Sequence, residues 1–286
     1  MLYYERTFEV PEFGVRLNQR ALMTPEIRFY DLESRGVVVE HGLTNLATTA
    51  VAGRAQVNLM REGVLTLRRD EGVFRVGAGE AFREPTLRYD ERWEGEPFRV
   101  LCVDWTTDEL TPIETRVLSD RATEVLAGIE LTEDVGGHEE VALRVVALLE
   151  EEGLGSPPID TITARVAPEL QRIAREYGRA MSSLSEQPMW CDFTEAVGMS
   201  ERQLRRHMTE VLSWFPGPVD EVSFRSVLNS TRMRRGLALM TASGATVGKV
   251  SEVLGYGSAV AFTNACQRAG LGKPSDFAER VAALGG

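Results

Sequence analysis

The stretch WCDFTEAVGMSERQLRRHM, residues 190–208, decides how the second half of this sequence folds. Its first eight residues have the pattern of a short amphipathic helix, a glycine then breaks the pattern, and Ser200 can cap the start of a second helix. In the second helix Arg202, Arg205 and Arg206 stand at positions i, i+3 and i+4, which share one helical face. The stretch therefore predicts two short helices joined by a glycine turn, with a basic face on the second.

The same layout returns near the end of the sequence in VGKVSEVLGYGSAVAFTNACQ, residues 247–267. The first helix of each copy contains a small residue, which is Thr194 in one and Ser251 in the other. A glycine follows four residues later in both copies, at Gly198 and Gly255. A small side chain lets two helices cross closely, and a glycine supplies the sharp turn between them. Both stretches are therefore predicted to be helix-turn-helix units, whose second helix enters the major groove of DNA.

The sequence between the two copies, FRSVLNSTRMRRGLALM (224–240), predicts one long helix. Apolar residues recur along it at positions 224, 228, 233, 237 and 240. Such a helix would hold the two units at a fixed separation. Its arginines Arg232, Arg234 and Arg235 could clamp DNA phosphates, or could pair with the acidic N-terminal half of the chain.

The closing stretch GYGSAVAFTNACQRAGLGKPSDF, residues 255–277, completes a recognisable pattern of glycine-aromatic, phenylalanine, basic helix, Pro-Ser and aromatic. The positions that fit it are Gly255, Tyr256, Phe262, Arg268, Pro274, Ser275 and Phe277. Together with the duplicated units, residues 165–286 resemble the AraC/XylS-type bacterial transcription regulators. The sequence departs from that family in the longer, more proline-rich connection at residues 213–223, and in the run Gly270-Leu271-Gly272.

The resemblance implies that Arg202, Arg205 and Arg206 on the first recognition helix read DNA bases. Arginine is the side chain best suited to guanine O6 and N7, and such a bidentate contact contributes roughly 1–3 kcal/mol of discrimination. The alternative is a solvated helix face on which these arginines pair with Glu201 or Glu210. Within a duplicated helix-turn-helix, base reading is the favoured interpretation.

The corresponding positions of the second recognition helix are chemically poorer. Ser258, Ala259, Ala261 and Asn264 are the residues predicted to face DNA there, with Val260 between them. The alanines and the valine can at most touch a thymine methyl, whereas Asn264 could pair with an adenine. The first unit should therefore carry most of the sequence reading, and the second should rely on shape and phosphates. Phosphate contacts are predicted for Arg232, Arg235 and Arg268.

The first hundred residues alternate, are rich in valine, threonine and aromatic residues, and are interrupted by glycine and proline. Strands are predicted at 36–42, 55–63, 63–72, 72–82 and 97–105. Regularly spaced short strands favour a small sandwich or barrel. The stretch GVFRVGAGEAFREP (72–85) resembles a cupin glycine-rich turn, which matches the usual companion domain of the family.

Helical periodicity follows at 113–129, 138–152 and 168–181. The apolar stripe in 138–152 is interpreted either as core against the barrel or, slightly favoured, as a dimer seam. Gly153, Gly155, Pro157 and Pro158 then indicate a linker. The predicted fold class is α+β in two domains: a small cupin-like β-barrel with dimerisation helices in 1–155, and an all-α domain of two helix-turn-helix units joined by a long helix in 160–286.

Several kinds of chemistry are excluded. The three histidines His41, His138 and His207 cannot assemble a metal site, and no complete phosphate loop, dinucleotide loop or nucleophile elbow is found, so neither a cofactor nor an enzyme is expected. The three scattered cysteines fit a reducing compartment. No signal peptide or membrane-length apolar run is seen, which predicts a cytoplasmic protein.

The net charge of −11 argues against a protein that coats nucleic acid over its whole surface. The charge is unevenly distributed: residues 188–286 hold 11 Lys and Arg against 9 Asp and Glu, whereas the first 187 residues hold 21 against 34.

A ligand pocket in the N-terminal half could be lined by the aromatic residues Phe82, Tyr89, Trp93 and Trp105, although core packing is favoured for these. If Arg54, Arg68 or Arg83 faced inward, an anionic ligand would be indicated.

The sequence thus predicts a DNA-binding transcription regulator. Its expected partners are double-stranded DNA, RNA polymerase, a small-molecule effector and a second copy of the chain as a homodimer. The alternative is a ligand-binding or protein-interaction module with a degenerate helix-turn-helix that does not read DNA.

Overall fold

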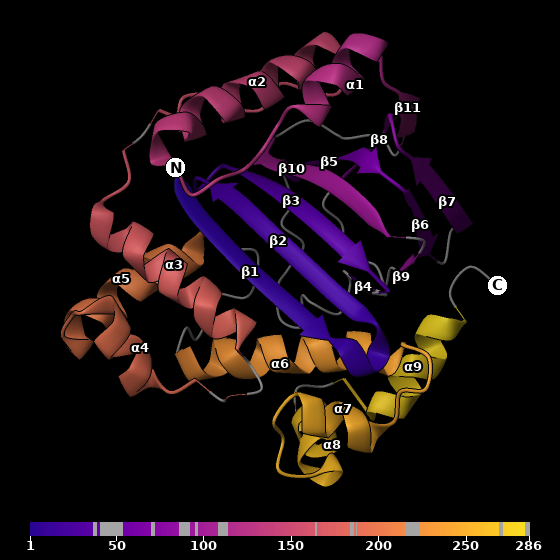
Figure 1. Ribbon diagram of the computed structural model, residues 1–286, viewed down its shortest axis with the longest axis vertical. Coiled ribbons are helices and arrows are strands. Elements are labelled where there is room, and N and C mark those ends of the chain that lie inside the picture. The colour runs from indigo at the N-terminus through magenta and orange to yellow at the C-terminus, as the bar shows by residue number, and fades with distance from the viewer. Residues whose placement is uncertain are drawn as a thin grey trace.

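The computed structural model arranges the chain in layers around a large β-sheet (Figure 1). The described residues are 1–36, 39–40, 54–69, 72–85, 92–94, 97–107, 114–163, 165–183, 186, 188–214, 224–268 and 271–283. Their strands are β1 (Leu2–Val10), β2 (Val15–Met23), β3 (Ile27–Arg35), β4 (Val39–Glu40), β5 (Arg54–Glu62), β6 (Val64–Arg69), β7 (Gly72–Gly77), β8 (Glu80–Pro85), β9 (Arg92–Glu94), β10 (Phe98–Thr106) and β11 (Glu114–Val117). Their helices are η1 (Pro11–Phe13), α1 (Asp120–Ala127), η3 (Val135–Gly137), α2 (His138–Glu151), α3 (Pro168–Ser182), α4 (Trp190–Val197), α5 (Glu201–Ser213), α6 (Phe224–Met240), α7 (Val247–Val253), α8 (Ala259–Arg268) and α9 (Pro274–Ala282).

The described strands form two antiparallel sheets, of order β1-β2-β3-β10-β5-β8-β11 and β4-β9-β6-β7. Met60, Phe82 and Val100 of the larger sheet pack in one hydrophobic cluster with Leu65 and Val76 of the smaller sheet. This arrangement is a two-layer sandwich. The prediction of a small cupin-like barrel is corrected accordingly, because each described sheet keeps its own edge strands, and the sandwich is the other form that the strand spacing favoured.

The opposite face of the larger sheet is covered by α1 and α2 (Figure 1). Leu101 and Val103 of β10 pack there against Val145 and Leu149 of α2. Because both α2 side chains are fully buried within the chain, they offer no surface to a partner. The dimer seam predicted in residues 138–152 is therefore wrong, and the alternative of core packing is confirmed.

The local patterns predicted most of these elements but missed some. Strands are confirmed at 55–63, 63–72 and 97–105, and of the strand predicted at 36–42 only β4 lies within the described residues. The single strand predicted at 72–82 is instead β7 and the start of β8, which a turn at residues 78–79 separates. The helix predicted at 113–129 is instead strand β11 followed by α1, because β11 pairs with β8 along its length. Strands β1, β2 and β3, each of 9 residues, were not predicted.

Helix α3 closes the edge of the larger sheet at β1. Gln171 accepts a hydrogen bond from the Tyr3 amide and donates one to the Tyr3 carbonyl, both at 2.9 Å, and Ser182 Oγ accepts from the Thr7 amide at 3.0 Å. Gly178 allows this approach, since a Cβ there would lie 2.1 Å from the Glu5 carbonyl oxygen. Side chains of α3 thus satisfy an edge that would otherwise be open to pairing.

The β1–β2 hairpin takes part in the packing of the C-terminal helices. Leu2, Tyr4, Ala21 and Met23 belong to the same hydrophobic cluster as residues of α3, α4, α5 and α6. Val10 and Val15, at the other end of the hairpin, belong to the cluster of α7, α8 and α9. The proposed division into residues 1–155 and 160–286 stays a prediction, but its two parts share hydrophobic cores. Among the described helices, none has the length and apolar character needed to span a bilayer.

Candidate nucleic-acid interface

The stretch predicted as the first helix-turn-helix unit forms two helices, α4 and α5, at the predicted positions, and we keep that name for the pair. Gly198 joins them in the left-handed conformation, with φ 68°, which is costly for residues that carry a Cβ. Ser200 caps α5, because its Oγ accepts from the Gln203 amide while the Gln203 side chain accepts from the Ser200 amide. Phe193 of α4 and Leu204 of α5 lie in the shared hydrophobic core of the two helices, where they are 4% and 0% exposed.

Arg202, Arg205 and Arg206 are all exposed on α5, as the helical spacing predicted. Arg205 is already engaged within the chain. Its Nε and Nη2 donate to Glu201 Oε1 at 3.0 and 2.5 Å, and its guanidinium carbon lies 5.3 Å from the Trp190 ring. The pairing with Glu201 that was the alternative interpretation is thus real for this one arginine. Such an exposed pair is weak, so it does not prevent exchange for another partner.

Arg202 and Arg206 are less constrained. Arg202 makes no hydrogen bond or ion pair with any described residue, and Arg206 only approaches the neighbouring ring, with Nη2 3.5 Å from His207 Nε2. Both guanidinium groups are exposed and therefore keep donors for an external acceptor. They are the better candidates for base or phosphate contacts on this helix.

The second unit, α7 and α8, repeats this combination of a glycine turn, a serine cap and a buried core, which we call the frame of the unit. Gly255 makes the turn with φ 68°, and Ser251, 3% exposed, is the small residue in α7. Ser258 caps α8, since its Oγ accepts from the Ala261 amide at 3.1 Å. Phe262 is fully buried beneath the crossing. Ser258, assigned to DNA contact from the sequence, therefore already uses its hydroxyl oxygen as a helix cap.

The outer face of α8 is mainly apolar. Val260 is 66% exposed, while Ala259 and Ala261 are half-buried. Asn264 is exposed, and Arg268 lies one turn further along with its Nε donating to the Asn264 carbonyl oxygen at 3.2 Å. The exposed Arg268 remains able to reach an external anion at the end of the helix.

Helix α6 connects the two units through their interiors. Phe224 and Leu228 at its start belong to the core of the first unit, where the Phe224 ring stacks on Phe193 at 4.6 Å. Met233 and Leu237 near its end belong to the core of the second unit. One continuous helix is thus shared by both cores, as the periodicity of 224–240 predicted.

Close packing of α6 on the second unit depends on Gly236. A Cβ at this position would lie 2.6 Å from Phe262 Cζ and 2.7 Å from Leu254 Cδ1. Arg232, four residues earlier, donates from Nη2 to the Gly255 carbonyl oxygen at 3.3 Å and lies 5.4 Å from the Tyr256 ring. Burial lowers the pKa of Arg232. In this conformation the Arg232 guanidinium stabilises the turn of the second unit, so only its remaining N–H groups are left for a phosphate.

Arg235 is the site residue that the structure contradicts most directly. It is 7% exposed, its guanidinium carbon lies 4.3 Å from the Phe8 ring of β1, and neither Nη atom has a hydrogen-bond partner among the described residues. Burial and the nearby charge of Arg6 lower the pKa of Arg235 to about 9. The predicted phosphate contact is unavailable here, because the β1–β2 hairpin covers this face of α6. The side chain of Arg234 lies outside the described part of the structure.

The predicted ligand-pocket residues of the sandwich do not converge. Phe82 packs between the sheets, whereas Trp105 packs on the helix-covered face. Arg54 points into the sandwich but its charge is met by Asp104, to which Nε donates at 3.3 Å. Tyr89 and the side chains of Trp93 and Arg68 lie outside the described residues. Among those described, no group of three or more His, Cys, Asp or Glu could hold a metal ion.

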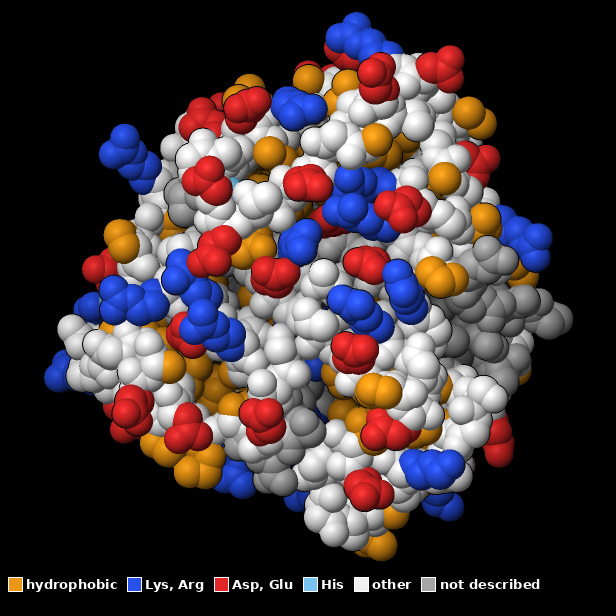
Figure 2. Space-filling view, in the orientation of Figure 1, with side chains coloured by type: hydrophobic (Ala, Val, Ile, Leu, Met, Phe, Trp, Pro, Cys, Tyr) orange, Lys and Arg blue, Asp and Glu red, His pale blue; other side chains and the backbone are white. Residues whose placement is uncertain are grey.

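The surface around the first unit mixes both signs of charge. Figure 2 shows Lys and Arg side chains gathered over the region of α3 and α5, with Asp and Glu side chains among them. The positive field is therefore local, so contacts must be made by particular arginines and not by a general basic surface.

Comparison with known proteins adds little to this geometry. The sequence matches no family model, and no curated protein matches it. ToxT from Vibrio cholerae superposes with a TM-score of 0.36 at 10% identity, over 91% of this chain and 100% of ToxT. The AraC-like transcriptional activator CuxR gives a TM-score of 0.36 at 17% identity, over 86% of this chain and 88% of CuxR. The EutQ protein of Clostridium difficile gives 0.27 at 13% identity, over 33% of this chain and 66% of EutQ. At such low scores and identities these similarities establish neither fold nor function.

Proposed function

We propose that the chain is a sequence-specific transcription regulator that binds double-stranded DNA through both helix-turn-helix units. The observation that carries the proposal is the shared linker helix. Side chains of α6 enter the cores of both units, and each unit exposes its second helix. Two recognition helices held in this way can enter successive major grooves, about 34 Å apart.

The two units divide the reading of the site. Arg202 and Arg206 of the first unit contact guanines, with Arg205 available after it leaves Glu201. Val260 of the second unit touches a thymine methyl and Asn264 pairs with an adenine. Arg268 contacts a phosphate at the end of α8. The second half-site is therefore specified mainly by DNA shape.

The N-terminal sandwich regulates this binding. Its β1–β2 hairpin belongs to the hydrophobic clusters of both units, so an event that shifts the hairpin changes how they are held. A small ligand or a second copy of the chain, in a homodimer, supplies that event. We place the protein in the cytoplasm with RNA polymerase as a further partner, and propose no catalytic activity.

The test is the affinity of the full chain for labelled genomic duplexes, measured by fluorescence anisotropy at several salt concentrations. The full chain is needed because the hairpin completes the cores of both units. We expect specific binding whose logarithmic affinity falls linearly with the logarithm of salt concentration. The double variant Arg202→Ala/Arg206→Ala should lose that binding, while Arg121→Ala on α1 should keep it. Absence of binding to any fragment at low salt would exclude the proposal.

The alternative function is a protein-interaction module. Val260 is an exposed apolar residue on the mainly apolar outer face of α8, which favours a protein partner. The net charge of −11 also favours it over DNA. In that case Val260→Asp would abolish partner binding, and the arginines of α5 would be dispensable.

A further inference from the structure

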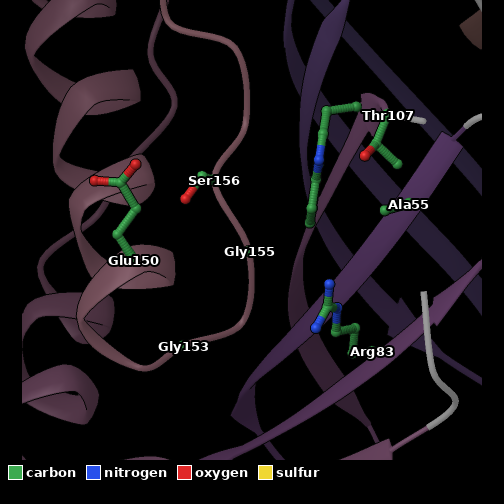
Figure 3. A pocket seen from close by; sticks show the side chains of 8 residues that line it. Ala55, Arg83, Thr107, Glu150, Gly153, Gly155 and Ser156 are labelled. Carbon is green, nitrogen blue, oxygen red and sulfur yellow. The ribbon is translucent and has the colours of Figure 1, made fainter. Parts of the chain in front are cut away.

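A preformed cavity lies outside the sandwich interior, between the helix-covered face of the larger sheet and the chain that leaves α2. Its volume is about 320 Å³, which falls at the small end of the range of about 300–1,000 Å³ for ligand pockets. Ala55 and Trp105 line it from the sheet, and Glu150, Gly155 and Ser156 line it from the end of α2 and the loop after it. Figure 3 shows Ala55 and Arg83 on the strands, Gly153, Gly155 and Ser156 on the loop beside them, and Glu150 on α2 behind that loop.

The loop that forms one wall is held in place by defined contacts. Gly155 has φ 143°, and a Cβ there would lie 2.6 Å from Trp105 Cζ2, so the loop backbone lies directly on the indole. The Leu154 amide donates to the Leu149 carbonyl oxygen at 2.8 Å, and Arg116 Nη1 donates to the Glu152 carbonyl oxygen. The cavity is therefore part of the folded chain and does not require a ligand to form.

Arg83 gives the cavity its chemistry. The side chain is 14% exposed, its Nε is buried without a hydrogen-bond partner among the described residues, and its Nη1 lies 3.9 Å from Glu114 Oε1, beyond hydrogen-bond distance. Arg116 shares that carboxylate, with Nη2 3.5 Å from the same oxygen. Within the part of the chain that the structure describes, Arg83 and Arg116 share one carboxylate, which leaves the buried Nε–H of Arg83 for an acceptor. Figure 3 shows the Arg83 guanidinium directed towards the loop.

We infer that this cavity binds a small monocarboxylate that carries a hydroxyl or ammonium group. The carboxylate accepts from Arg83, which is the planar group best matched to it. The donor of the ligand meets Ser156 Oγ and Glu150 on the opposite wall. Glu150 and Glu114 disfavour a doubly charged ligand such as a phosphate ester. The volume admits about ten non-hydrogen atoms, at about 30 Å³ each.

The position of the site indicates what its occupancy would alter. The loop that lines it continues through residues 157–163 towards α3, which packs against both the β1 edge and the first helix-turn-helix unit. A bound carboxylate would brace this connection and so change DNA affinity. This last step rests on the proposed function, whereas ligand binding itself does not.

The test is calorimetric titration of the full chain with 6-hydroxyhexanoate, 6-aminohexanoate and neutral 6-hydroxyhexanamide, whose donor group lies at the end of the molecule opposite the carboxylate or amide. We expect saturable one-to-one binding of at least one of the two acids, weakened about tenfold or more in the amide. Arg83→Met should abolish it, and Arg121→Met, which removes an exposed guanidinium from α1, should leave it unchanged. Ser156→Phe, at an exposed loop position, should also abolish it by filling the cavity, and decides the matter if Arg83→Met does not fold.

Two results would overturn the inference. One is the absence of saturable binding by both acids up to about 10 mM. The other is binding that survives in Ser156→Phe or is equally strong for the amide. DNA affinity measured with and without the acid tests the proposed function and is independent of the test of ligand binding. If the acid binds and DNA does not, the carboxylate site stands and the proposed function fails.

Discussion

The two helix-turn-helix units share a frame and differ in the face that they present. Both make the turn with a glycine at φ 68° and cap the second helix with a serine. Each also buries a phenylalanine, which is Phe193 of α4 in the first unit and Phe262 of α8 in the second. The exposed face of α5 holds three arginines, whereas that of α8 holds Val260 between two half-buried alanines. The residues that fix the fold of a unit are therefore separate from those that choose its ligand.

The largest expected effect is on the free energy of unfolding, and it distinguishes a buried residue of α8 from an exposed one. Phe262→Ala removes a fully buried ring from the core shared with α6, and should lower the free energy of unfolding by about 3–5 kcal/mol. Val260→Ala, two residues earlier and 66% exposed, should change it by about 0.5 kcal/mol or less. Denaturant unfolding of both variants checks this. Similar losses in the two variants would mean that α8 does not pack as described.

The next effect concerns the face of α5. Arg206→Ala should reduce specific DNA affinity by about 1–3 kcal/mol, because a guanidinium contact to guanine is lost. Asn264→Ala in the second unit should cost less, since that half-site is read mainly through shape. Anisotropy titrations at one fixed salt concentration compare the two. A larger loss from Asn264→Ala would reverse the proposed division between units.

A third prediction concerns Arg235, which lies between the β1–β2 hairpin and α6. Arg235→Met should raise the free energy of unfolding by about 1 kcal/mol or more, because it removes a buried charge that has no ionic partner among the described residues. The folded pKa of about 9 lies below the ordinary value of 12.5, so the unfolded chain binds more protons between these values. Wild-type stability attributable to this group therefore rises with pH in that window.

The advantage of Arg235→Met should accordingly be constant below pH 9 and should shrink above it. Chemical unfolding of wild type and variant at pH 7, 8 and about 10 measures the difference. Arg225→Met, at an exposed position at the start of α6, is the matched control. A destabilised Arg235→Met would show that the guanidinium has a partner that holds it in place.

The smallest effect tests the equivalence of the two caps. Ser200→Ala and Ser258→Ala should each cost about 1 kcal/mol, since each removes an acceptor for an amide in the first turn of a recognition helix. Thermal unfolding monitored by circular dichroism is sufficient. Equal losses support a common frame, and a neutral Ser258→Ala would set the second unit apart.

Local sequence signals predicted the C-terminal half well because its determinants are local. Glycine turns, serine caps and helical spacing lie within a few residues of one another, so α4, α5, α6, α7 and α8 could be placed from the sequence. The exposure of Arg202, Arg205 and Arg206 follows from the same periodicity. Their readiness to bind does not, because the Trp190 ring beside Arg205 comes from another helix.

What the sequence did not predict depends on contacts between distant residues. The stripe of α2 is apolar whether a sheet or a second chain covers it, and only the fold decides for the sheet. Arg235 resembles any arginine on a basic helix until Phe8 is placed beside it. A signal for that contact was present in β1, where Leu2, Tyr4, Phe8 and Val10 alternate along one face.

The central claim is that the first unit reads sequence while the second follows DNA shape. Selection of bound sequences from a random duplex library by the full chain tests it most directly. We predict enriched sites with guanines at one half-site and little base preference about 10 base pairs away. In Arg202→Ala/Arg206→Ala the guanine preference should disappear. No enrichment by the wild-type chain, or a guanine preference that persists in the double variant, would contradict the claim.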